Sequence, residues 1–170
     1  KDGLNSTLTD NFTKNDGTYK CIPVDSNIQE VFDYIMDTSG SITTNDADTY
    51  CRLETLKVSS DNFTSPGCVK IASPPAASSH DSGITNQKFT LDPVDNLSYY
   101  TTYQVRVETG VEDALENNMT SQYTHSNAFR TSAFPSSTPT SGVFVAVGQY
   151  GETFRSIDNG TSWDNGTCVY

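Results

Sequence analysis

The sequence is poor in cations, in helix-forming aliphatic residues and in long apolar runs, and each shortage excludes a class of protein. Ten Lys and Arg stand against 21 Asp and Glu, so the net charge is −11. Because phosphate contacts need clustered cations, neither nucleic acid nor an anionic membrane surface is the expected partner. No stretch approaches the roughly 20 apolar residues that span a bilayer. With two Met and seven Leu in 170 residues, a helical bundle is not expected either.

Histidine is scarce as well, and this bears on catalysis. His80 lies beside Asp81 in a serine-rich loop, which suggests a Ser–His–Asp set. Triad members are normally brought together from separate elements, so we predict a solvated loop histidine instead. His125 sits near a strand end and is expected to be exposed. The sequence therefore predicts no catalytic residues and no enzyme.

The four cysteines contain no C-x-x-C pair, which excludes zinc-ribbon and thioredoxin-type motifs by spacing. An even count in a Thr-rich chain predicts disulfides and hence an extracellular or bacterial cell-surface location. Cys51 and Cys68 are predicted to pair across a short loop, at about 3 kcal/mol on the chain-entropy model. Cys21 and Cys168 would form the remaining pair. The chain begins at Lys1, as expected where a leader has been removed or the sequence starts within a longer protein.

Asn-x-Ser/Thr sequons are frequent, and each marks a candidate glycosylation site in a secreted chain. Chance occurrence is the alternative, because Asn, Ser and Thr are all abundant. The sequons begin at Asn5, Asn11, Asn62, Asn96, Asn118, Asn159 and Asn165.

Acidic residues gather at 45–48, at Asp92 and Asp95, and at 112–116. Calcium prefers six to eight oxygen ligands from such loops, although the EF-hand spacing is absent. Solvated acidic loops are the alternative. We expect no cofactor and no dedicated metal ligands, with Ca²⁺ as the one candidate ion.

Strand patterns dominate the middle of the chain. Tyr103, Val105 and Val107 alternate with polar residues through 101–108, which predicts a strand with one buried face. Shorter strands are predicted at 26–33, 53–59, 67–72, 87–91 and 122–131, with a Pro/Ala/Ser loop at 73–83. This spacing is typical of an all-β antiparallel sandwich. The predicted core consists of Phe32, Val58, Phe89, Leu91, Tyr103, Val105, Val107 and Phe129.

Composition divides the chain into four parts. Residues 1–19 form a polar arm or edge strand, 20–134 the sandwich, and 135–141 a Pro/Ser/Thr linker. Residues 142–170 are predicted to form a C-terminal β-hairpin extension.

Three segments resemble the bacterial Ig-like domains of the SbsA type. They are VDSNIQEVFDYIMDTSGSIT from Val24, NLSYYTTYQVRVETGVEDALENNM from Asn96, and FRTS from Phe129. The chain has Leu115-Glu116-Asn117 where the family usually has a Gly-Asn turn, so that turn is expected to be altered. The resemblance implies an Ig-like sandwich carried on a surface protein.

The tail resembles an Asp box of the BNR type, in SIDNGTSW from Ser156 to Trp163. Asp158 is expected to accept backbone N–H bonds in a tight turn, Gly160 to supply a positive φ, and Trp163 to pack across the hairpin. Such boxes recur in sialidase-like propellers. A propeller needs at least four blades, so a fragment of one is only a remote alternative.

These features together predict a structural or assembly module that associates with itself or with neighbouring domains. The apolar tail would add a strand to the edge of another subunit, as in a filament. Its inserting residues are Val143, Phe144, Val145 and Val147. The alternative is an adhesin whose Tyr99, Tyr100 and Tyr150 stack on a glycan.

Overall fold

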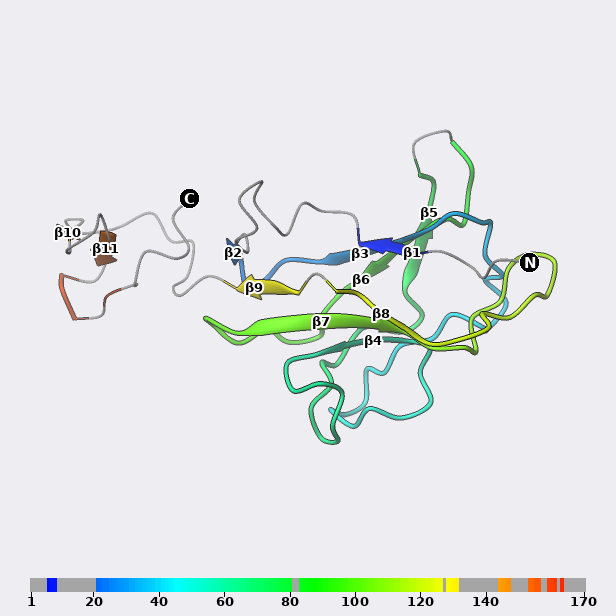
Figure 1. Cartoon of the computed structure of the whole chain (residues 1–170), viewed down its shortest axis with the longest axis horizontal. Coiled ribbons are helices and arrows are strands. Elements are labelled where there is room, and N and C mark those ends of the chain that lie inside the picture. The colour runs from blue at the N-terminus through cyan, green and yellow to red at the C-terminus, as the bar shows by residue number, and fades with distance from the viewer. Residues whose placement is uncertain are drawn as a thin grey trace.

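A computed structural model describes residues 6–8, 21–80, 83–126, 128–131, 144–147, 153–156, 159–161 and 163. Within these ranges the chain is all-β and contains no helix (Figure 1). The same ranges contain no helix long and apolar enough to cross a membrane. Two sheets make up the main body, as the alternating sequence pattern predicts.

The first sheet has four antiparallel strands in the order β1-β3-β6-β5. They are β1 (Ser6–Leu8), β3 (Ile28–Phe32), β6 (Lys88–Leu91) and β5 (Ala76–Ser78). In the register, Ile28 pairs with Leu91 and Glu30 with Phe89. β5 is an outer strand of this sheet, and all three of its residues are exposed.

The second sheet has five strands in the order β2-β9-β7-β4, with β8 also paired to β7. They are β2 (Cys21–Ile22), β9 (Phe129–Thr131), β7 (Thr102–Val107), β4 (Leu56–Ser59) and β8 (Tyr123–Thr124). The pair β2–β9 is parallel, and the other pairs are antiparallel.

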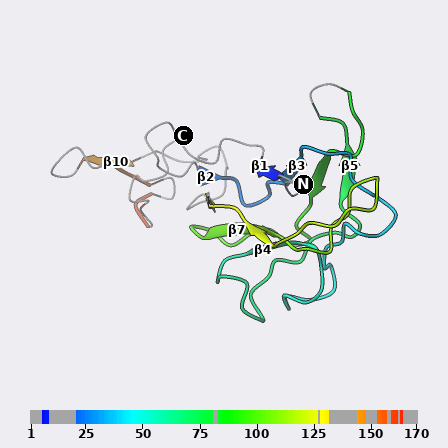
Figure 2. The same cartoon turned by 45° about the vertical axis from the view of Figure 1, so that its right-hand side comes forward.

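The two sheets face each other and enclose one core. Figure 2 shows β7 and β4 in one layer and β3 and β5 in the other. All eight residues of the predicted core are buried. The rings of Tyr103 and Phe129 stack at 5.5 Å, and those of Phe32 and Phe89 meet edge to face at 5.8 Å. The sandwich therefore rests on apolar burial between sheets.

Three predicted segments differ from the structure. Residues 73–83 contain strand β5, because an edge strand is held by backbone bonds to β6 and needs no apolar pattern. Residues 67–72 form only the isolated bridges Ser59–Cys68 and Ile71–Pro93. The segment 122–131 splits into β8 and β9, which pair one after the other along β7.

A third pairing joins β10 (Phe144–Val147) and β11 (Thr153–Ser156) as an antiparallel hairpin. Among the named strands, these two pair only with each other. Phe144 lies opposite Ser156, and Val147 lies opposite Thr153.

Candidate functional site

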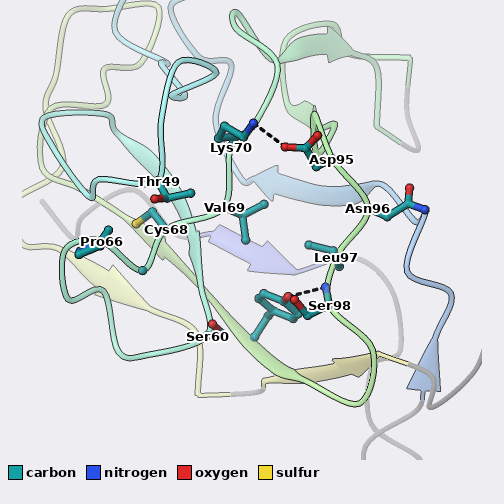
Figure 3. Close-up of a pocket in the computed structure, with 12 residues that line it drawn as sticks. Thr49, Ser60, Pro66, Cys68, Val69, Lys70, Asp95, Asn96, Leu97 and Ser98 are labelled. Carbon is teal, nitrogen blue, oxygen red and sulfur yellow. Dashed lines mark hydrogen bonds and ion pairs between the residues drawn. The ribbon is translucent and has the colours of Figure 1, made fainter.

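A hollow of about 320 Å³ opens on the side of the sandwich where β4 and the start of β7 lie (Figure 3). One wall comes from Ser60, Pro66 and Gly67, and the other from Asp95 and Asn96. Figure 3 shows Val69 and Leu97 pointing into the space between these walls, whereas Asn96 points away from it. The hollow thus has an apolar floor between polar walls.

Electrostatically, the hollow is close to neutral. The Lys70 ammonium forms an ion pair with the Asp95 carboxylate at 2.5 Å on its rim. The Tyr103 hydroxyl accepts a hydrogen bond from the Ser98 backbone N–H at 2.9 Å. Since these groups are already paired, the hollow presents little charge with which to select an ionic ligand.

A disulfide braces one wall of the hollow. Cys51 and Cys68 are joined, with Cα atoms 5.2 Å apart and a sequence separation of 17, as the loop spacing predicts. Beside it, the Ser59 hydroxyl accepts hydrogen bonds from the N–H groups of Asp61 and Phe63 and contacts the Gly67 carbonyl at 2.9 Å. A Cβ at Gly67 would overlap the Asp61 carboxylate, so any larger residue here would require the Asp61 side chain to move. The loop 60–68 is therefore held firmly to β4.

The predicted pair of Cys21 and Cys168 lies outside the described side chains. Of Cys21 only the backbone is described, in strand β2, and Cys168 falls in 164–170. The pairing stays a prediction.

His80 lies in the loop between β5 and β6, where its carbonyl accepts a hydrogen bond from Gly83 N–H at 2.9 Å. Asp81 lies outside the described residues, so the expectation of a solvated loop histidine at His80 stays a prediction.

The expectation that His125 is exposed is wrong. Its side chain is 5% exposed, and its Nε2 lies 3.0 Å from Oε1 of Glu30, which is fully buried. Glu30 stands between Ile28 and Phe32 on the face of β3 that points into the core, and His125 continues β8 through a bond from its N–H to the Val105 carbonyl. The pair thus links the two sheets.

The burial of Glu30 was not predicted, although the strand pattern around it indicates a buried carboxylate. Alternation places Glu30 on the same face as Ile28 and Phe32, so a strand buried on that face must bury the carboxylate. Its Oε2 atom is buried and has no hydrogen-bond partner. A buried acid–histidine pair between two sheets fits a structural role in the core.

Carboxylates in the acidic loops accept hydrogen bonds from nearby donors in the same loop. The Asp37 carboxylate accepts from the backbone N–H and the hydroxyl of Ser39, and these bonds lower the pKa of Asp37. The pKa of Asp48 is lowered first by the N–H of Tyr50 and then by the Asn45 amide, and Arg52 adds an ion pair at 2.8 Å. These loops are Asx-type turns.

In the described part of the chain, no three His, Cys, Asp or Glu side chains lie close enough together to hold a metal ion. In the acidic segment 112–116, the Asp113 carboxylate accepts hydrogen bonds from the backbone N–H groups of Leu115 and Asn117. These bonds belong to a local turn. In this turn Glu116 has a φ of +63°, and the alteration expected from the family pattern stays a prediction. Calcium binding stays a prediction.

The tyrosines predicted to stack on a glycan differ in how much of the ring is exposed. Tyr99 is 45% exposed and Tyr100 is 37% exposed. The guanidinium of Arg130 lies 3.6 Å from the centre of the Tyr100 ring, so one face of that ring is covered. Tyr150 lies outside the described residues.

In the tail, Phe144 is 49% exposed and Val145 is 65% exposed. The side chains of Val143 and Val147 are not among those described. Phe144 and Val145 therefore present apolar surface on a two-stranded hairpin.

The predicted Asp-box residues are described in part. The Ser156 hydroxyl is buried and accepts a hydrogen bond from Gly160 N–H at 2.8 Å, and Gly160 has the expected positive φ of 83°. The Trp163 indole donates to the Gly160 carbonyl at 3.1 Å. Asp158 lies outside the described residues, so the box stays a prediction.

Four of the predicted sequons start at described residues. Asn62, Asn96, Asn118 and Asn159 are all exposed, whereas Asn5, Asn11 and Asn165 lie outside the described residues. Asn118 differs because its amide donates to Glu112 Oε1 at 3.0 Å.

Comparison with known proteins gives one match. A family model described as a bacterial Ig-like domain matches residues 15–131, which is more than half of the chain. No curated protein matches.

Proposed function

Because this chain belongs to the bacterial Ig-like domain family, we propose that it serves as a structural module of an exported surface protein. Domains of this family occur in surface proteins and are generally non-catalytic. The observation that carries the proposal is the single core between two sheets, braced by the Cys51–Cys68 disulfide. A disulfide persists in an oxidising compartment, and a rigid sandwich is suited to spacing and display.

The finer proposal is that the tail assembles the module. Phe144 and Val145 expose apolar surface on β10, and an isolated two-stranded hairpin is marginally stable in water. Such a hairpin gains stability by docking on a sheet. β5 is an outer strand whose residues are all exposed, so the edge of a second copy is a suitable partner for strand addition.

Light scattering tests this assembly. We expect the molar mass of the full chain to rise with concentration, and removal of residues 142–170 to leave a monomer. Phe144→Ser with Val145→Ser should weaken association to a similar degree, because the apolar contact is lost. Ala146→Ser on the same strand is the matched control. An assembly that persists without residues 142–170 contradicts the proposal.

The exposed ring of Tyr99 supports a second candidate, a glycan-binding adhesin. A glycan array compares the full chain with Tyr99→Ala and with the exposed-residue control Leu53→Ala. Binding that Tyr99→Ala removes and Leu53→Ala retains would favour the adhesin, and absence of binding would reject it.

A further inference from the structure

We propose that Asn62 and Asn96 carry N-linked carbohydrate and that the two sugars flank the same hollow. The inference rests on export, as set out under the proposed function. Both residues begin sequons, completed by Thr64 and Ser98. Four described sequons exist, so the structure has to distinguish among them.

Asn62 lies at the tip of the turn that follows β4. Its φ is +60°, a conformation that Asn tolerates better than most residues, and the next residue, Phe63, has φ +61°. The guanidinium of Arg106 lies 3.9 Å from the centre of the Phe63 ring, which anchors the turn. The exposed Asn62 amide makes no hydrogen bond within the described part of the chain, so its nitrogen is free to carry a substituent.

Asn96 lies in the connection between β6 and β7, where both residues after it are fixed. The Leu97 N–H donates to the Val24 carbonyl at 2.8 Å, and the Ser98 N–H donates to the Tyr103 hydroxyl at 2.9 Å. Leu97 is buried, while Asn96 is exposed and points away from the hollow (Figure 3). The Asn96 amide also has no hydrogen-bond partner among the described residues.

Asn118 provides the contrast. Its amide nitrogen donates to Glu112 Oε1 at 3.0 Å, across the bridge that joins the two residues. A sugar on that nitrogen would compete with the carboxylate for the same space. Occupancy at Asn118 should therefore be lower than at Asn62 or Asn96.

The modification is a group transfer. The asparagine amide nitrogen bonds to the anomeric carbon of a sugar activated by a phosphate-linked leaving group at that carbon. The bond from the anomeric carbon to the phosphate oxygen breaks with its electron pair, and the nitrogen gives up one proton. The product is a neutral N-glycosidic linkage, so no charge is added to the chain.

The positions of the two sites define a face. The segment after β4, which contains Asn62, forms one wall of the hollow through Ser60, Pro66 and Gly67. Asn96 belongs to the other wall. Because the Asn96 side chain points away from the hollow, a sugar on it would stand on the outer side of that wall and leave the floor of Val69 and Leu97 uncovered. This face would then point toward solvent in the assembled surface protein, leaving β1 and β5 for contacts with neighbours.

Glycopeptide mass spectrometry tests the proposal on the full chain produced in its own cells. The chain is recovered from outside the cells and digested with a protease. We expect carbohydrate on Asn62 and Asn96 and at least tenfold less on Asn118. Thr64→Ala and Ser98→Ala should each remove one sugar chain without altering the asparagine. Thr64→Ser keeps the sequon and should keep the sugar.

The outcomes separate the two proposals. A chain outside the cell with Asn62 and Asn96 unmodified overturns the glycosylation and leaves export intact. Modification of Asn118 at or above the level of the other two overturns the structural argument. A chain found only inside the cell overturns both.

Discussion

At the scale of single residues, the most consequential contact is the buried pair of Glu30 and His125. Glu30 is fully buried and His125 is 5% exposed. Their bond satisfies one carboxylate oxygen, but Oε2 has no partner. Taking such groups out of water is costly, and a buried pair recovers that cost only through good geometry. We therefore expect the pair to contribute more to pairing the sheets correctly than to net stability.

Removing one partner should harm the fold more than removing both. His125→Leu leaves the Glu30 carboxylate buried without a partner, and we expect a loss of about 3 kcal/mol or more in the free energy of unfolding. The double variant Glu30→Leu with His125→Leu should recover most of it, because two apolar groups replace the pair. Urea unfolding of the parent, Glu30→Leu, His125→Leu and the double variant measures this cycle.

A matched control comes from the rim of the hollow. Lys70 and Asp95 have side-chain exposures of 31% and 70%, so Lys70→Met should cost no more than about 1 kcal/mol. A double variant at Glu30 and His125 as unstable as His125→Leu would show that the pair itself stabilises the core.

At the scale of elements, the loop from Cys51 to Cys68 is held by a disulfide and by a bridge to β4. The disulfide closes a loop of 17 positions, and Cys68 also bridges to Ser59 at the end of β4. The crosslink restricts the unfolded chain and fixes the wall of the hollow.

Loss of this crosslink should lower stability by about 3 kcal/mol on the chain-entropy model. The double variant Cys51→Ala with Cys68→Ala should unfold at a lower urea concentration than the parent. Adding a reductant should destabilise the parent more than the variant, which retains only the predicted pair of Cys21 and Cys168. A variant as stable as the oxidised parent would contradict the prediction.

At the scale of the whole molecule, the excess of acid makes stability depend on pH. The net charge is −11, yet Asp37 and Asp48 each have a lowered pKa because N–H and hydroxyl donors favour their charged forms. A carboxyl whose pKa is lower in the folded state binds protons less readily there than in the unfolded chain. Its contribution is present above the ordinary value of 3.8 and is lost as pH falls through the folded pKa.

Urea unfolding at neutral pH and at about pH 3 checks this prediction. The parent should be less stable at the acidic value, and Asp37→Asn with Asp48→Asn should show a smaller fall. Asp46→Asn is the matched control, because Asp46 is exposed in the same loop as Asp48 and has no hydrogen bond among the described residues. If the free energy of unfolding fell equally in the parent and the double variant, Asp37 and Asp48 would not be the source of the pH dependence.

The sequence by itself determined the sandwich, its core and the loop disulfide. Alternation along β7 places Tyr103, Val105 and Val107 on one face, because successive side chains of a strand point to opposite sides. The pairing of Cys51 with Cys68 follows from their short separation. Both are local properties, and local properties can be read along a chain.

Only the tertiary structure decided which distant groups meet. His125 is buried because Glu30, 95 positions earlier, approaches it from the other sheet. β5 forms because β6 offers backbone partners to a segment whose side chains carry no strand pattern. The hollow exists because the segment after β4 and the segment before β7 converge. Each of these features depends on how the two sheets pack. The spacing of residues along the chain does not predict that packing.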